Sequence, residues 1–62
     1  MRFQVSDMAC ADCARAIERA VAQAGGKAAA DPQSRLVTVE NLGTQPAIAA
    51  ISAAGYTAEP LD

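Results

Sequence analysis

The sequence predicts an α+β fold, in which a four-stranded antiparallel sheet carries two helices on one face. The chain has 62 residues, enough for one small domain over residues 1–62. Segments with strand periodicity and segments with helix periodicity alternate along it in the order strand, helix, strand, strand, helix, strand. Each half of the chain therefore contains one apolar helix face and two strands that can cover it.

Alternation of polar and apolar side chains predicts the first strand, and the end of this alternation predicts the loop that follows it. Residues 2–5 alternate polar and apolar side chains, so that Phe3 and Val5 share one face of a half-buried strand. Residues 6–12 are small and mostly polar, and we expect a loop there. Asp12, at the end of this loop, is a residue type that caps helices well.

The first helix is predicted over residues 13–24, and Gly25 and Gly26 end it. Residues 27–30 are expected to form a weak strand, because a turn signal follows at residues 31–34 but the three alanines have low strand propensity. The helix carries one apolar stripe at helical spacing, formed by Ile17, Ala20, Val21 and Ala24.

The second half repeats this pattern. Leu36–Glu40 alternates strictly and predicts a strand. Thr44 can cap a second helix, whose first turn tolerates Pro46 and which Gly55 ends. Residues 56–59 are expected to form a short last strand. The apolar stripe of the second helix is formed by Ala47, Ile48, Ile51 and Ala54.

This element order is the split β-α-β arrangement of a ferredoxin-like βαββαβ sandwich. In that arrangement, the loop that carries Cys10 and Cys13 and the loop that carries Gly55 and Tyr56 are expected at the same end of the sheet. We therefore treat this end as the candidate functional end.

Composition excludes several function classes. The net charge is −2, there is no run of Lys or Arg, and only two residues are aromatic, which disfavours nucleic-acid binding. No apolar segment approaches the roughly 20 residues of a membrane span, and none resembles a signal peptide, so a cytoplasmic location is expected. The sequence has no histidine, which removes imidazole chemistry. We expect a protein that is not an enzyme.

Cys10 and Cys13 are the residues with distinctive chemistry. Cytosolic thiols stay reduced, so a Cys-x-x-Cys pair there indicates metal binding or redox chemistry rather than a structural disulfide. The positive end of a helix lowers thiol pKa values and supplies thiolates, most of all at Cys13. Two thiolates without further ligands suit Cu(I), whereas zinc prefers four ligands. Dithiol redox catalysis and half of a zinc site shared across a dimer are the alternatives.

The segment from Met8 to Cys13, Met-Ala-Cys-Ala-Asp-Cys, resembles the Met-x-Cys-x-x-Cys motif of the heavy-metal-associated domain family, especially its bacterial copper chaperones. The resemblance extends to Asp31-Pro32 before Leu36–Glu40, and to Ala54-Gly55-Tyr56 near the end. It therefore covers nearly the whole chain.

The resemblance implies that Cys10 and Cys13 bind Cu(I), that Met8 is a buried anchor of the loop rather than a ligand, and that Tyr56 lies near the site. It also implies a copper-transporting P-type ATPase as receiver. This chain departs from the family in having Asp7 where glycine commonly precedes the methionine, and in lacking bulky apolar residues in the second strand. Ala9 stands where members that prefer zinc or cadmium often carry an acid, which favours copper.

Three further roles are open on sequence alone. Tyr56 either hydrogen-bonds toward a thiolate or covers the end of the core. Asp12 either caps the helix or modulates the thiolates. Arg15 and Arg19 lie four positions apart on the exposed helix face and either dock on an acidic partner or are simply solvated.

The sequence thus predicts a soluble Cu(I) metallochaperone that is a monomer without metal and that transfers its ion by ligand exchange. A copper-bridged dimer is left open. The alternatives are a module for another soft metal such as mercury, a domain excised from a transporter or from mercuric reductase, and a dithiol oxidoreductase.

Overall fold

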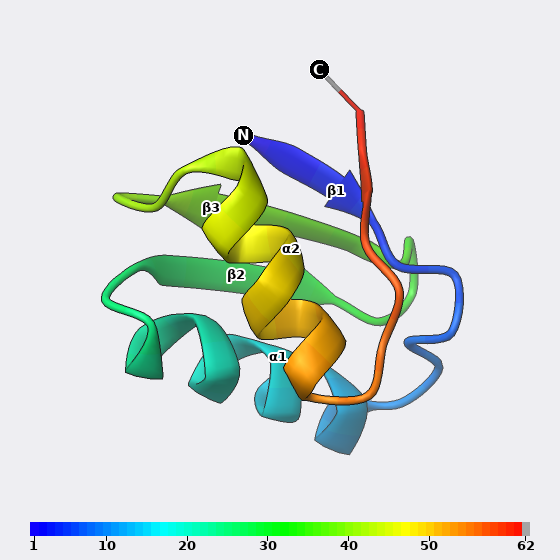
Figure 1. Ribbon diagram of the computed structural model, residues 1–62. Coiled ribbons are helices and arrows are strands. Elements are labelled where there is room, and N and C mark those ends of the chain that lie inside the picture. The colour runs from blue at the N-terminus through cyan, green and yellow to red at the C-terminus, as the bar shows by residue number, and fades with distance from the viewer. Residues whose placement is uncertain (62) are drawn as a thin grey trace.

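Both helices lie on one face of a four-stranded sheet in the computed structural model, which describes residues 1–61 (Figure 1). The strands run in the order β2-β3-β1-β4, and each neighbouring pair is antiparallel. This arrangement confirms the predicted ferredoxin-like fold class. The elements are β1 (Arg2–Gln4), α1 (Ala11–Gln23), β2 (Lys27–Asp31), β3 (Leu36–Glu40), α2 (Thr44–Ala53) and β4 (Glu59–Pro60).

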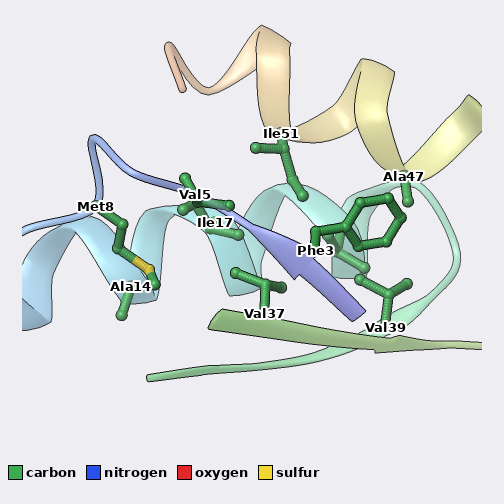
Figure 2. Packing of buried hydrophobic residues seen from close by; sticks show 10 residues of the cluster. Phe3, Val5, Met8, Ala14, Ile17, Val37, Val39, Ala47 and Ile51 are labelled. Carbon is green, nitrogen blue, oxygen red and sulfur yellow. The ribbon is translucent and has the colours of Figure 1, made fainter. Parts of the chain in front are cut away.

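The core lies between the sheet and the two helices (Figure 2). Alternation in β1 and β3 directs one side chain in two toward the helices, as the sequence predicts. Burial of each larger apolar side chain contributes about 1.5–3 kcal/mol, so a small set of residues supplies most of the stability. The buried apolar residues include Phe3, Val5, Met8, Ala14, Ile17, Val21, Val37, Val39, Ala47 and Ile51.

The edge strand β2 contributes only small side chains to the core. Ala28 and Ala30 are only partly buried, in agreement with the small side chains that the sequence provides there. The backbone N–H of Ala30 donates to a carboxylate oxygen of Glu18 on α1, at 3.0 Å. This contact satisfies a donor on an open edge, where an unpaired N–H would invite pairing with another strand.

The first helix begins two residues earlier than predicted, and the prediction that Asp12 is its N-cap is wrong. The N-cap is Cys10, whose backbone is extended and whose sulfur accepts a hydrogen bond from the N–H of Cys13. Asp12 lies inside the first turn instead. A carboxylate there is still favourable, because the N-terminal end of a helix attracts negative charge.

The second helix also begins differently from the prediction. Its N-cap is Gly43, without a side-chain hydrogen bond, so Thr44 is the first helical residue and not the cap. The Thr44 hydroxyl lies 3.2 Å from the sulfur of Met1. Pro46 falls in the first turn as expected, where its missing N–H has no helical partner to lose.

The last strand is shorter and later than predicted. Residues 56–58 do not pair in the sheet, and β4 starts at Glu59, opposite Gln4. The physical reason is that the N–H of Thr57 donates to the carboxylate of Asp7 and not to a strand. The chain therefore passes beside the cysteine loop before it joins the sheet (Figure 1).

Within residues 1–61, neither helix combines the length and the apolar character needed to cross a lipid bilayer.

Candidate metal centre

The loop before α1 is held by two buried residues. Val5 and Met8 are both fully buried, and the N–H of Met8 donates to the carbonyl of Val5 at 3.1 Å. This closes a tight turn that leaves Ser6 and Asp7 exposed between two core anchors. Figure 2 shows Met8 pointing from the loop into the core beside α1. The turn and the buried Met8 side chain therefore fix the position of the backbone just before Cys10.

The two cysteines lie at the start of α1. Their sulfurs are 2.8 Å apart, and both are free thiols rather than a disulfide. Cys10 is exposed, whereas Cys13 is half-buried and packs against the core. The sulfur of Cys10 also accepts the N–H of Cys13 at 3.4 Å, so one of the unpaired donors at the helix end is directed at this sulfur. Negative charge at this point is therefore favoured.

Hydrogen bonds to the Cys13 sulfur lower the pKa of this thiol from its ordinary 9.0 to about 7. The largest cause is the hydrogen bond with Cys10, followed by one with the Tyr56 hydroxyl and one with the backbone of Ala9. Partial burial acts in the opposite direction. Near neutral pH a large fraction of Cys13 is therefore thiolate, which is the form that binds metals.

Tyr56 lies at the site, as the topology predicts. The interaction of its hydroxyl with Cys13, followed by burial and by the nearby negative charge of Cys13, Cys10 and Asp7, raises the pKa of Tyr56 to about 12. The ring also packs against the core. Tyr56 therefore lies near Cys13 and also covers part of the core, so the two roles that the sequence leaves open are compatible with each other.

Tyr56 owes its position to the end of α2. Gly55 has a positive φ of 97°, a conformation that L-residues rarely adopt. The N–H of Tyr56 then donates to the carbonyl of Ile51, and that of Gly55 to Ser52. These two bonds form a Schellman motif, which turns the chain sharply out of the helix.

Asp7 lies at the site, although the sequence did not identify it as a site residue. Its two carboxylate oxygens accept the N–H of Thr57 at 3.3 Å each, from 50 positions along the chain. The signal in the sequence was an acid at the position where the family commonly has glycine. Among the described residues, Asp7 is not one of those with positive φ, so the turn does not need glycine.

The remaining predicted residues lie on the exposed surface of α1. Asp12, Arg15 and Arg19 are all exposed. Asp12 is in the first turn, next to the thiols in sequence, and the two arginines follow along the helix. The structure does not bring either arginine into contact with the cysteines.

The donor set is small. Within residues 1–61, no cluster of three or more His, Cys, Asp or Glu side chains is arranged to hold a metal ion. The pair of thiols therefore forms a candidate site with two sulfur ligands and an open side toward solvent. Such a set is too small for a structural zinc ion, which takes four ligands.

We expect alkylation of Cys13 by iodoacetamide to titrate with a midpoint near pH 7, because only the thiolate reacts. Below this pH the rate should fall as the thiol form takes over. Tyr56→Phe removes one hydrogen bond that stabilises the thiolate but keeps the ring, so the midpoint should move upward toward 9.0. Mass spectrometry of the modified peptide gives the rate, and an identical midpoint in the variant would show that the hydroxyl does not act on Cys13.

Comparison with known proteins places this arrangement in a family. No protein-family profile and no curated protein sequence matches the chain. Several solved structures match nearly all of it. A trimeric mutant form of the copper chaperone Atx1 from Synechocystis PCC6803 is 34% identical with a TM-score of 0.85, over 95% of this chain and 98% of that one.

Two other structures agree. A protein from Agrobacterium tumefaciens is 38% identical with a TM-score of 0.84, over 92% of this chain and 94% of that one. A gold binding protein is 32% identical with a TM-score of 0.85, over 95% of both chains. Shared sequence and fold over nearly the full length show that the chain belongs to the heavy-metal-associated domain family, which includes the Atx1 copper chaperones.

Proposed function

We propose that the chain is a copper metallochaperone that binds one Cu(I) ion through the thiolates of Cys10 and Cys13 and passes it on by ligand exchange. The observation that carries this proposal is the pair of free sulfurs, 2.8 Å apart, at the N-terminal end of α1. Copper chaperones among the similar structures support it. Residues 1–62 are taken as one heavy-metal-associated domain.

The ligand chemistry favours Cu(I). Thiolates are soft ligands and select soft ions, and Cu(I) is stable with few ligands. Zinc would require ligands from outside the chain to complete four. Met8, which is fully buried, is proposed to fix the loop and not to bind the ion. Asp12 is proposed to support the helix start through its charge.

Binding requires the sulfurs to separate. With metal–sulfur bonds of about 2.3 Å, as in zinc sites, sulfurs 2.8 Å apart would meet the ion at an angle of only about 75°. Two-coordinate Cu(I) prefers opposed ligands. Cys10 is the more exposed of the pair and lies at the cap rather than inside the helix, so its side chain has more room to turn outward.

Ligand exchange follows from the same exposure. An incoming thiolate from a partner can reach the ion from the solvent side and form a third copper–sulfur bond. One bond to this chain then breaks, and the released thiolate takes up a proton or returns to its hydrogen bonds. No electrons change hands, and no covalent bond of a substrate is made or broken, so the proposed role is not enzymatic.

The proposed receiver is a copper-transporting P-type ATPase, through its metal-binding domain or its entry site. A reducing compartment such as the cytoplasm would keep both thiols available. The metal-free chain is proposed to act as a monomer, and a copper-bridged dimer is the alternative when a second chain supplies the incoming thiolates.

A dithiol oxidoreductase is the second candidate, and the lowered pKa of Cys13 favours it, since thiolates also attack disulfides. Measurements of disulfide exchange and of metal affinity distinguish the two candidate functions. Fast thiol–disulfide exchange without Cu(I) affinity would favour the oxidoreductase. Retention of Hg(II) but not of Cu(I) would favour a mercury-handling module.

The transfer step can be tested with a purified ATPase metal-binding domain. We expect Cu(I) to pass from the loaded chain to this domain during a brief incubation. Gel filtration then separates the two proteins, and the copper content of each fraction shows the transfer. Charge reversal of Arg15 and Arg19 to glutamate should slow transfer about tenfold or more if they dock on an acidic surface, since opposite surface charge accelerates association by such factors.

The control is charge reversal of Lys27 and Arg35, which are exposed residues of β2 and of the turn before β3. Cu(I) affinity should stay the same in all variants. Equal slowing in both pairs would indicate a general effect of net charge and would contradict docking through α1.

A further inference from the structure

We propose that Asp7 is a positioning residue: its carboxylate clamps the segment after α2 onto the cysteine loop and so fixes the position of Tyr56 beside the pair of thiols. This inference rests on the proposed function, because it assigns to Asp7 a part in retaining the metal ion. We call the contact between Asp7 and Thr57 the clamp.

Within residues 1–61, no backbone–backbone hydrogen bond joins the two segments that the clamp connects. The N–H of Thr57 lies 3.3 Å from each oxygen of Asp7, so one donor is shared between two acceptor atoms. Residues 56–58 make no strand pairing, and β4 begins only at Glu59. The clamp therefore positions this segment beside the cysteine loop, together with the packing of Tyr56 and Ala58 against the core.

Tyr56 is held from both sides. On its N-terminal side, the N–H of Tyr56 itself donates to Ile51 at the end of α2. On its C-terminal side, the next residue, Thr57, is held by Asp7. The Tyr56 side chain leaves the backbone between these two fixed points. A residue held in this way loses little further freedom when its hydroxyl bonds to sulfur.

Asp7 itself is well fixed. It occupies a turn between Val5 and Met8, both fully buried and joined by a backbone hydrogen bond. The negative charge of Asp7 is also the smallest of the causes that raise the pKa of Tyr56. A glycine here would allow the same turn but could not form the clamp.

The clamp and the charge of Asp7 act in opposite directions on the thiolates. A hydroxyl held beside the thiols can donate a hydrogen bond to a thiolate, whereas a nearby carboxylate repels a thiolate. Tyr56 is partly buried, whereas Asp7 is exposed, so solvent screens the charge of Asp7. We therefore expect the positioning effect to dominate and loss of Asp7 to weaken metal retention.

Four variants test this: Asp7→Ala, Asp7→Asn, Tyr56→Phe and the double variant of Asp7→Ala with Tyr56→Phe. Asp7→Ala should raise the Cu(I) dissociation constant about three- to tenfold, the range expected for one hydrogen bond to a charged group that is partly screened. Asp7→Asn keeps an acceptor oxygen and should recover most of the affinity. In the Tyr56→Phe background, Asp7→Ala should add little, because the hydroxyl that it positions is gone.

Two measurements on the metal-free chain make the test independent of copper. The amide of Thr57 should exchange hydrogen about tenfold faster in Asp7→Ala, while core amides of β3 stay protected. The chain has one tyrosine and no tryptophan, so its intrinsic fluorescence reports on Tyr56 alone and should change in the same variant. Ser6→Ala, in the same exposed turn, is the matched control and should change neither.

The outcomes are distinct. Tighter Cu(I) binding in both Asp7→Ala and Asp7→Asn would show that Asp7 acts only by charge and would overturn the inference. So would unchanged exchange at Thr57, or full additivity of the two substitutions. Absence of Cu(I) binding in the unaltered chain would instead overturn the proposed function, whereas the exchange and fluorescence results would still decide whether the clamp exists.

Discussion

Replacing either Cys10 or Cys13 with serine is expected to weaken Cu(I) binding by about a thousandfold or more. Metal binding by thiolate sites is worth about 10 kcal/mol or more, and each of the two sulfurs carries a large part of it. Loss of about 4 kcal/mol corresponds to a factor of a thousand. A serine hydroxyl is a hard, protonated ligand and does not replace a thiolate for a soft ion.

Anaerobic competition with a coloured Cu(I) chelator measures this effect. Ala11→Ser is the control, because it places a hydroxyl at an exposed position in the same helical turn without removing a sulfur. It should bind Cu(I) as the unaltered chain does. Tight binding that survives each single cysteine substitution would contradict a site made of these two thiolates.

Met8→Ala is expected to lower the free energy of unfolding by about 2–5 kcal/mol, the usual cost of truncating a buried Met, Leu or Ile side chain. The Met8 side chain is fully buried in the core. A domain of this size has a total stability of only about 3–9 kcal/mol, taking roughly 0.05–0.15 kcal/mol per residue. The variant should therefore lose much of its stability. The turn that leads to Cys10 should also become less ordered.

Met8→Leu separates packing from metal binding. Leucine has a similar volume and should cost less than about 1.5 kcal/mol, while it removes the thioether sulfur. If Met8 only anchors the loop, Cu(I) affinity in this variant stays unchanged. Denaturant unfolding gives the stability and chelator competition gives the affinity. A stable Met8→Leu protein that loses Cu(I) affinity more than about tenfold would assign the thioether to the ion.

The fold could be predicted from the sequence because its signals are local and agree with one another. Strict alternation in Leu36–Glu40 predicted β3 with its observed bounds. The glycines after each helix predicted where α1 and α2 end, and Gly25 and Gly55 both adopt positive φ. The apolar stripes predicted the buried positions Ile17, Val21, Ala47 and Ile51. Ala24, which was expected in the stripe of α1, is exposed.

The helix starts could not be predicted correctly, because several residues compete to be the cap. Asp12 is the better N-cap by residue type, but the sulfur of Cys10 takes that place and accepts the N–H of Cys13. At α2, Gly43 precedes the helix although Thr44 is the stronger capping type. Which residue adopts the extended backbone of the cap depends on how the preceding loop enters the helix, and here the fully buried Met8 lies two residues before the cap.

The clamp could not be predicted because it joins residues 50 positions apart through an exposed side chain. No periodicity or turn rule relates Asp7 to Thr57. Its formation also explains the error at the last strand, since the backbone donor of Thr57 is used by Asp7 before the sheet begins at Glu59. By contrast, the proximity of Tyr56 to the cysteines followed from the order of the elements.

The proposed copper site depends most on the two sulfurs as its metal ligands. Copper K-edge X-ray absorption of the unaltered chain, loaded anaerobically with one equivalent of copper and desalted, tests this most directly. We predict an edge typical of Cu(I) and a first shell of sulfur atoms alone, two per copper. A first shell that contains nitrogen or oxygen, or loss of the copper on desalting, would contradict a two-thiolate Cu(I) carrier.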